Sequence, residues 1–182
     1  LLFIGGLSDG LYTVPYVNEL AKALEPTDWS VFCLLLSSSY NGWGIGSVHQ
    51  DIEEIAQCVQ FVRKYKASHA PQGKVVIMGH STGSQDVLHY LYAPNPLPHD
   101  PAFEGKLQHL VRPQVDGAIL QAPVSDREVV IHTLKTASES NDASEAYEQL
   151  VDSARRQQAD GIHSIVPSHL VKLTGLPDDV PI

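Results

Sequence analysis

Residues 74–92, KVVIMGHSTGSQDVLHYLY, decide the fold of this chain. The short apolar run VVIM at 75–78 has the composition of a buried strand, and residues 84–92 suit a helix. The segment between them, GHSTG at 79–83, is therefore expected to turn sharply, with Ser81 at its apex. The two flanking glycines leave out side chains that would crowd the neighbouring strand and helix.

Ser81 is predicted to be a catalytic nucleophile on a nucleophile elbow. At the apex of a strand–turn–helix unit, a serine hydroxyl is held clear of the backbone, beside the first amide of the helix. Serine is a poor nucleophile at neutral pH, so it needs a base, usually histidine, and an acid that orients this base. Gly-x-Ser-x-Gly recurs by chance, but its place between an apolar strand and a helix makes the signal strong. The alternative is a serine that only caps the helix.

The serine also needs two hydrogen-bond donors for the oxyanion that forms when it attacks an acyl carbon. The first is the backbone amide of Thr82, the residue after the nucleophile. The second is expected in the loop after the apolar run at 1–4, where Gly5 and Gly6 let the backbone turn its amides toward the serine. We predict Leu7 as this donor, with Gly6 as the next choice. A plain glycine turn without a catalytic role is the alternative.

The rest of the chain alternates apolar strands with helices. Strands are expected at 1–4, 29–36, 75–78 and 115–121, and helices between Thr13 and Pro26, at 47–65 and at 84–92. Continuous apolar strands separated by helices indicate a parallel sheet that is covered on both faces. The predicted fold class is therefore α/β, a doubly wound, mostly parallel sheet, with residues 1–125 as its core.

The helix at 47–65 is strongly amphipathic. Its apolar stripe consists of Val48, Ile52, Ile55, Ala56, Val59 and Val62, and Cys58, Phe61 and Tyr65 widen this stripe along one edge. Ser47 and Gln50 form a capping-box pattern at its start. Three acids near its N-terminus, among them Asp51 and Glu54, are favoured there by the helix dipole and are expected to be solvated.

A loop rich in serine and glycine, SSSYNGWGIG at 37–46, follows the second expected strand. It leaves the carboxyl end of that strand, which is the edge at which open α/β sheets bind their ligands. Tyr40 and Trp43 in this loop either line a ligand pocket or pack onto the next helix.

Length and composition restrict the function. The chain has 182 residues, which suits one domain or part of one, and its hydrophobic content of 43% allows a sizeable core. Twelve Lys and Arg against 21 Asp and Glu give a net charge of −9, which argues against nucleic acid or an anionic membrane surface as a partner. No apolar run approaches the length of about 18 residues that a membrane-spanning helix needs.

Metal ligands and disulfides are not expected. The nine histidines are scattered, and no group of His, Cys, Asp or Glu has metal-ligand spacing. Cys33 lies in an apolar strand-like run and Cys58 in a helix-like one, so both are predicted to be buried free thiols. Nothing in the sequence requires a metal or an organic cofactor.

Helical patterns dominate from residue 126 onward, so residues 126–182 are predicted to form a helical cap or lid. The chain starts in an apolar run without a methionine and ends without a closing element, and both ends are therefore expected to be truncated. A cytoplasmic location is expected.

Three stretches resemble a family of fungal and protist α/β-hydrolases: LLFIGGLSDGLYTVPYV at 1–17, GHSTGSQDVLHYL at 79–91 and GAILQAPVSDRE at 117–128. This family includes esterases that open hydroxamate siderophores of the fusarinine type. The resemblance covers most of the chain, and GHSTGSQD and QAPVSDRE are its specific parts. It implies an α/β-hydrolase fold with a helical cap and the hydrolysis of esters by a serine.

The chain departs from this family in the rest of the catalytic triad. In such enzymes the order is Ser, acid, His, but no further sheet strand is expected after Gln121, and two strands usually present before Leu1 are missing. Asp126 lies just past the strand after the elbow, a position that some α/β-hydrolases use for the acid; a helix cap or a salt bridge with Arg127 is the alternative. The remaining candidates for the base are expected to be surface or cap residues, or to pack beneath the turn: His132, His163, His169 and His80.

The leading hypothesis from the sequence is a serine esterase that acts through an acyl-enzyme on Ser81. Its partner would be a small-molecule ester, with a hydroxamate siderophore ester as a candidate substrate. Two alternatives stay open. One is a catalytically inactive binding protein on the same scaffold, because the acid and the base are not evident. The other is an acyltransferase, which uses the same elbow and excludes water.

Overall fold

The computed structural model describes residues 1–42, 46–69, 71–97 and 111–125, together with six single helical positions in the C-terminal part. These positions are His132, Glu145, Glu148, Gln149, Asp152 and Arg156. The elements in chain order are β1 (Leu2–Ile4), α1 (Tyr16–Leu24), β2 (Phe32–Cys33), α2 (Val48–Lys66), β3 (Val76–His80), α3 (Gly83–Tyr92) and β4 (Gly117–Gln121). The predicted alternation of strands and helices is confirmed. The predicted cap at 126–182 lies outside the described residues, apart from the six positions, and stays a prediction.

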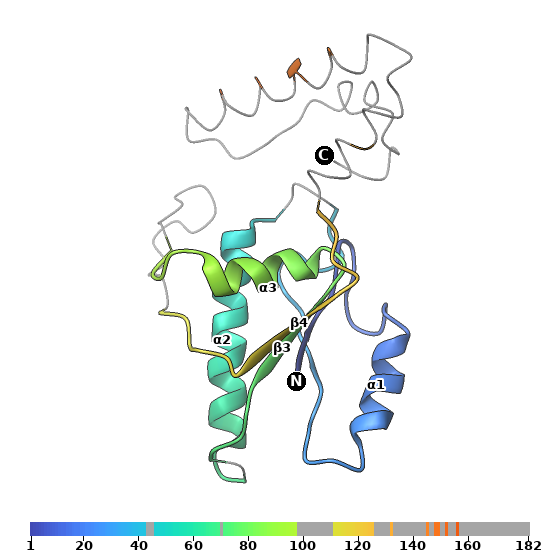
Figure 1. Cartoon of the computed structure of the whole chain (residues 1–182), viewed down its shortest axis with the longest axis vertical. Helices are drawn as coiled ribbons and strands as arrows, with labels where there is room; N and C mark the ends of the chain where they lie inside the picture. Colours follow the sequence, from blue (N-terminus) through green and yellow to red (C-terminus); the bar gives the residue numbers. More distant parts are fainter. Residues whose placement is uncertain are drawn as a thin grey trace.

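The four strands form one parallel sheet in the order β2-β1-β3-β4 (Figure 1). At its centre, Leu2 of β1 is aligned with Phe32 of β2 on one side and with Ile77 of β3 on the other. Parallel strands end at the same edge of a sheet. The loop after β1 and the turn after β3 therefore lie side by side at the carboxyl edge, where such sheets bind ligands.

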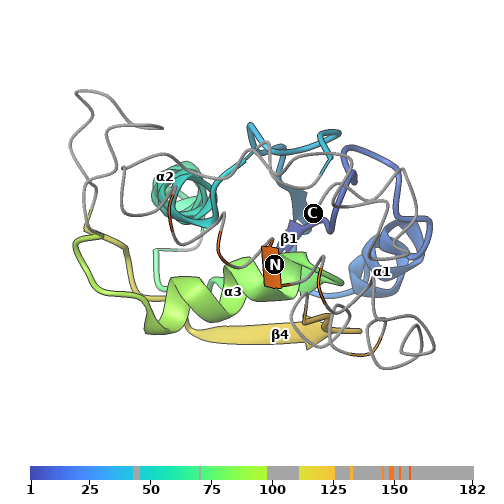
Figure 2. The ribbon, with the colours of Figure 1, turned by 90° about the horizontal axis from the view of Figure 1, so that it is seen from above.

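Helices cover both faces of the sheet, so the sheet is doubly wound as predicted. Successive residues of a strand point to opposite faces, which divides the core in two. On one face, β1 and β3 pack against α2 and α3 in a cluster that includes Leu2, Ile4, Ile52, Ile55, Val59, Ile77 and Val87. On the other face, next to α1, the buried cluster consists of Leu1, Phe3, Val14, Val17 and Met78. Figure 2 shows α1 and α2 on opposite sides of the strands.

Helix α2 buries most of the predicted apolar stripe. Its buried hydrophobic residues are Ile52, Ile55, Ala56, Val59 and Val62. Ser47 caps the helix, because its hydroxyl accepts a hydrogen bond from the His49 amide at 3.2 Å. The second half of the predicted capping box does not form, since the Gln50 side chain donates to Glu54 at 3.0 Å instead.

Two predictions about α2 are wrong. Phe61 and Tyr65 do not widen the buried stripe; they are 64% and 61% exposed, and their rings stack on each other. Asp51 is not solvated but buried, because the loop after β2 covers the first turn of the helix. The Ser38 hydroxyl in that loop donates a hydrogen bond of 2.7 Å to the Asp51 carboxylate.

Two strands differ from their predictions. The strand expected at 29–36 is reduced to the two residues of β2, and the predicted burial of both thiols is wrong: Cys33 is exposed and Cys58 is half-buried. In β4, predicted to be a buried strand, Ile119 and Leu120 are exposed, because among the described strands β4 pairs with β3 alone.

Among the described residues, no helix is long and apolar enough to cross a membrane.

Gly79 and Gly83 allow three backbone segments to meet at the carboxyl edge. A Cβ atom on Gly83 would lie 2.8 Å from the Ile4 carbonyl oxygen and nearer still to that of Gly5. A Cβ atom on Gly79 would lie 2.6 Å from the Ser84 amide nitrogen. All of these separations are well inside van der Waals contact, and the atoms that would be met belong to the backbone. Both positions therefore require glycine for steric reasons.

We expect Gly83→Ala to lower the free energy of unfolding by about 1–3 kcal/mol, because the methyl group overpacks the contact between α3 and the end of β1. Helix propensity alone predicts the opposite sign, since alanine is favoured over glycine by about 1 kcal/mol in a helix. Urea unfolding of wild type and variant measures the difference.

Gly117→Ala in β4 is the matched control for this substitution, because its Cβ would meet only the Val76 side chain, at 3.3 Å. Its effect should be the smaller of the two. A Gly83→Ala protein as stable as wild type would contradict the steric explanation.

Candidate active site

Ser81 is the apex of the turn between β3 and α3. Its φ angle is 53°, in the left-handed region that costs a residue other than glycine about 1–3 kcal/mol. Hydrogen bonds hold the turn from both sides: the Ser81 amide donates to the Gln121 carbonyl of β4 at 3.0 Å, and the Ser84 amide donates to the Ser81 carbonyl at 3.1 Å. Within the turn, the buried Ser84 hydroxyl donates to the Gly79 carbonyl at 3.0 Å. The surroundings thus maintain a strained backbone that fixes the position of the serine.

The loop after β1 lies directly against Ser81. A Cβ atom on Gly6 would lie 2.9 Å from the Ser81 Cβ and 3.0 Å from the His80 carbonyl oxygen, so the two backbones approach closely here. The Asp9 amide donates to the Gly6 carbonyl at 3.0 Å, and the Asp9 carboxylate accepts from the Gly6 amide at 2.8 Å. These two bonds close the loop into a tight turn, in which Ser8 has a positive φ of 61°.

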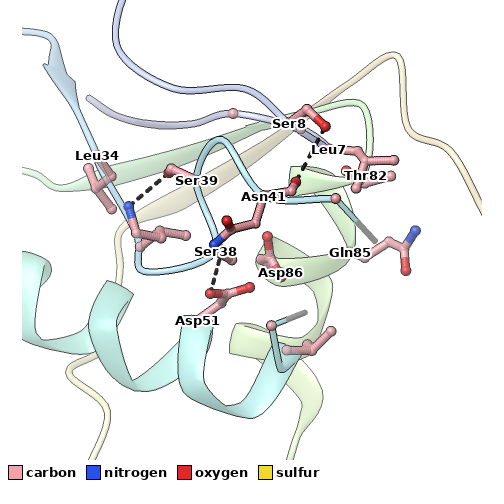
Figure 3. Close-up of a pocket in the computed structure, with 16 residues that line it drawn as sticks. Leu7, Ser8, Leu34, Ser38, Ser39, Asn41, Asp51, Thr82, Gln85 and Asp86 are labelled. Carbon is pink, nitrogen blue, oxygen red and sulfur yellow. Dashed lines mark hydrogen bonds between the residues drawn. The ribbon is translucent and has the colours of Figure 1, made fainter. Parts of the chain in front are cut away.

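The three amides proposed as oxyanion donors differ in whether they already have a hydrogen-bond partner. The Gly6 amide is used by Asp9. The amides of Leu7 and Thr82 make no hydrogen bond with any residue that the structure describes, and both residues line the same cavity (Figure 3). An oxyanion accepts from backbone amides of this kind, and these two come from the residue after Ser81 and from the loop packed against it.

Asp9 is a site residue that the sequence analysis missed. Its carboxylate holds Gly6, and its second oxygen accepts a hydrogen bond of 2.9 Å from the Thr13 hydroxyl, so Thr13 fastens the loop instead of capping α1. The Asp9 carbonyl accepts from the Tyr40 amide at 3.0 Å. The Asp9 carboxylate bonds back to an amide three residues earlier, a pattern that the common turn signals do not describe.

The structure places Tyr40 away from the cavity. Its hydroxyl accepts a hydrogen bond of 2.8 Å from the Leu11 amide, its ring packs on Gly10, and it is 56% exposed. Tyr40 thus belongs to the fastening of the β1 loop. Trp43, the other residue predicted for a pocket, lies outside the described residues, as does Asp126, the candidate acid.

A cavity of about 290 Å³ is lined in part by Leu7 and Thr82 (Figure 3). The loops after β1 and β2, the first turn of α2 and the start of α3 form its walls. Its polar lining residues are Ser8, Ser38, Ser39, Asn41, Asp51, Thr82, Gln85 and Asp86. Burial raises the pKa of Asp51 to about 6, the Ser38 hydrogen bond opposes this rise, and the negative charge of Glu54 adds to it.

His80 is held beneath the turn on the α1 side of the sheet. Its Nδ1 hydrogen-bonds to the Gln121 side-chain oxygen, which also accepts from the Tyr16 hydroxyl at 3.0 Å. A carboxamide oxygen only accepts, so this contact assigns a proton to Nδ1. The His80 ring also stacks on Phe3. Burial, followed by the charge of Asp9, raises the pKa of Tyr16 and keeps its hydroxyl a donor.

The Ser81 hydroxyl forms no hydrogen bond with a histidine among the described residues. His132 is exposed and interacts with another group of the protein. His163 and His169 lie outside the described part of the chain. No group of three or more His, Cys, Asp or Glu in the described ranges is placed to hold a metal ion.

The complete sequence, residues 1–182, matches a family described as "Protein of unknown function (DUF1749)". The chain belongs to this family. The predicted resemblance to a fungal family with siderophore esterases is confirmed by the relatives that follow.

Three relatives are informative. Fusarinine C esterase sidJ of Aspergillus fumigatus is 46% identical over 183 residues, covering 95% of this chain and 52% of the relative. Esterase AN6793 of Emericella nidulans is 41% identical over 192 residues, covering 97% and 51%. The solved structure of siderophore hydrolase EstB from Aspergillus fumigatus matches with a TM-score of 0.68 and 42% identity, covering 100% of this chain and 53% of that chain.

The structural match and the parallel sheet with its covering helices show the predicted α/β-hydrolase fold. The chain spans about half the length of the curated relatives it matches.

The raised pKa of Asp51 predicts a pH-dependent stability. The carboxyl titrates near 3.8 when unfolded and at about 6 when folded, so its contribution is greatest below pH 3.8 and is lost as the pH rises to about 6. By linkage the loss is at most about 3 kcal/mol. Asp51→Asn keeps an acceptor for Ser38 and carries no charge, so its stability should decline less between pH 4 and 7.

Urea unfolding at a series of pH values measures this decline. The exposed residue Glu25 offers a control, since Glu25→Gln should retain the wild-type dependence. Parallel curves for wild type and Asp51→Asn would show that the buried carboxylate does not titrate as described.

Proposed function

We propose that the chain carries the nucleophile and the oxyanion site of a serine esterase. The observation that carries the proposal is the strained Ser81, with φ at 53°, packed against the loop after β1, where the amides of Leu7 and Thr82 have no partner among the described residues. The relatives named as esterases and as a siderophore hydrolase support ester hydrolysis as the reaction.

In the proposed reaction, the Ser81 Oγ attacks the carbonyl carbon of the ester and its proton passes to a base. The carbonyl oxygen becomes an oxyanion that accepts hydrogen bonds from the Leu7 and Thr82 amides. Collapse of the tetrahedral intermediate breaks the bond to the alcohol oxygen, which leaves with the proton, and an acyl-enzyme on Ser81 remains. Water then attacks the acyl group, releases the acid and restores the serine.

A histidine base and an acid that orients it complete a mechanism of this kind. His80 does not suit the role of base, because its ring packs against Phe3 and Tyr16 beneath the turn and forms no hydrogen bond with Ser81. Asp126 remains the candidate acid from the sequence. The proposed substrate class is the ester bond of hydroxamate siderophores, on the strength of the relatives named fusarinine C esterase and siderophore hydrolase.

A fluorophosphonate probe tests the nucleophile. We expect protein expressed from its complete gene to be labelled at Ser81, and Ser81→Ala to lose labelling together with hydrolysis of fusarinine C. Ser68→Ala, at an exposed position near the end of α2, is the control and should be labelled like wild type. Undiminished labelling of Ser81→Ala would contradict the proposal. If Ser81 is labelled but fusarinine C is not hydrolysed, the proposed nucleophile is retained and the substrate is another class of ester.

A second experiment tests the oxyanion site through Asp9, a positioning residue that fastens the Gly6 amide. Asp9→Ala should lower kcat by about 10- to 100-fold with little change in KM, because the Leu7 amide acts mainly in the transition state. Asp9→Asn keeps an oxygen acceptor and should retain more activity. A rise in KM with an unchanged kcat would show instead that the loop contributes to ground-state binding.

A further inference from the structure

The cavity beside the Leu7 and Thr82 amides contains a buried carboxylate. Asp51 is 8% exposed and lines this cavity from the first turn of α2. Its Oδ1 accepts the hydrogen bond from Ser38, whereas its Oδ2 forms no hydrogen bond with any described residue. Figure 3 shows Asp51 across the cavity from Leu7 and Thr82. One oxygen of a buried carboxylate is thus left to accept from a ligand.

Among the described residues, no cation lines the cavity to balance this charge. None of the described lining residues is Lys, Arg or His, and Asp86, which interacts with another group, lines the cavity from α3. Glu54, on the turn of α2 after Asp51, adds a third negative charge nearby; it accepts from the Ser37 amide at 2.7 Å and from the Gln50 side chain. A buried carboxylate without a cationic partner is costly to a fold. An anionic ligand would be repelled here, and a cationic one would supply the missing partner.

Two neutral side chains of the lining also have acceptor atoms left. The Asn41 side-chain nitrogen donates to the Ser37 carbonyl at 3.0 Å, and the Gln85 side-chain nitrogen donates to the Val124 carbonyl at 3.0 Å. Each of these nitrogens keeps a second N–H, and the side-chain oxygens of Asn41 and Gln85 form no hydrogen bond with a described residue. These oxygens are neutral acceptors beside the Asp51 carboxylate, which is the charged acceptor of the lining.

We propose that this cavity binds a primary ammonium group on the arm of the ester substrate that enters it, with Asp51 as the ion-pair partner. An ammonium group has three N–H donors and no acceptor, which matches the free acceptors of the lining. A volume of about 290 Å³ accommodates one small substrate arm. The inference rests on the proposed function, because the ester carbonyl must lie at the Leu7 and Thr82 amides for its arm to reach this cavity.

Binding to the Ser81→Ala protein tests this inference without turnover. The probes are ethyl esters of glycine, β-alanine and 6-aminohexanoic acid, each paired with the ester in which methyl replaces ammonium: propanoate, butanoate and heptanoate. A second set places the ammonium on the alcohol side, as 2-aminoethyl and propyl butanoate. Titration calorimetry at pH 7.5 gives each Kd. We expect one or more pairs to favour the ammonium ester at least tenfold, and Asp51→Asn to reduce this preference to less than threefold.

Ser38→Ala separates the charge of Asp51 from its second role, which is to hold the loop after β2. This variant removes the hydrogen bond and keeps the carboxylate, so it should retain the ammonium preference. Equal affinity for the members of every pair, or a preference that survives Asp51→Asn, would overturn the inference. Loss of the preference in Ser38→Ala to the same extent as in Asp51→Asn would assign Asp51 to loop anchoring and would also overturn it.

The binding experiment distinguishes a failure of this inference from a failure of the proposed hydrolysis. A preference for ammonium in binding, in a protein that hydrolyses no ester, would retain the binding site and reject the esterase. Ester hydrolysis by wild type, with equal affinity for the members of every pair, would retain the esterase and reject the ammonium site.

Discussion

The close backbone contact between the end of β1, the end of β3 and the start of α3 is the constraint on which the site depends. Gly79 and Gly83 make this contact possible, since a Cβ atom at either position would collide with backbone atoms. The approach places the loop after β1 against Ser81, and Leu7 and Thr82 line the same cavity there. It also closes one wall of the cavity that Asp51 lines from α2. The same steric condition therefore positions both Ser81 and the candidate binding cavity.

Local sequence patterns predicted the elements and the turn. The βα alternation, the parallel sheet and the bounds of α2 and α3 follow from apolar periodicity and from capping residues, which act over a few neighbouring positions. Ser81 could be singled out for the same reason, because the strand, the turn and the helix that define its position are contiguous. The two amides could be proposed because one adjoins the serine and the other follows a strand that ends in two glycines.

Contacts between segments distant in sequence account for what was missed. Asp51 is buried because the loop between β2 and α2 folds back over it, with Ser38 bonded to a residue 13 positions later, although its place four residues before Ile55 puts it beside the apolar stripe. Tyr40 was assigned to a pocket from its loop alone, yet its hydroxyl bonds to Leu11, 29 positions away. The exposure of Ile119 in β4 depends on which strands are present beside it. None of these facts is encoded in a local window.

The left-handed backbone at Ser81 has a consequence for how the protein can change. Glycine is the residue that adopts this conformation without strain, so Ser81→Gly would relax the turn while removing the hydroxyl. Mutational drift under selection for stability alone would favour that replacement, and only a requirement for the side chain opposes it. Stability thus favours glycine at this position, whereas the proposed chemistry requires serine. In a descendant that kept the fold and no longer required the Ser81 side chain, glycine is the residue expected at the apex of this turn.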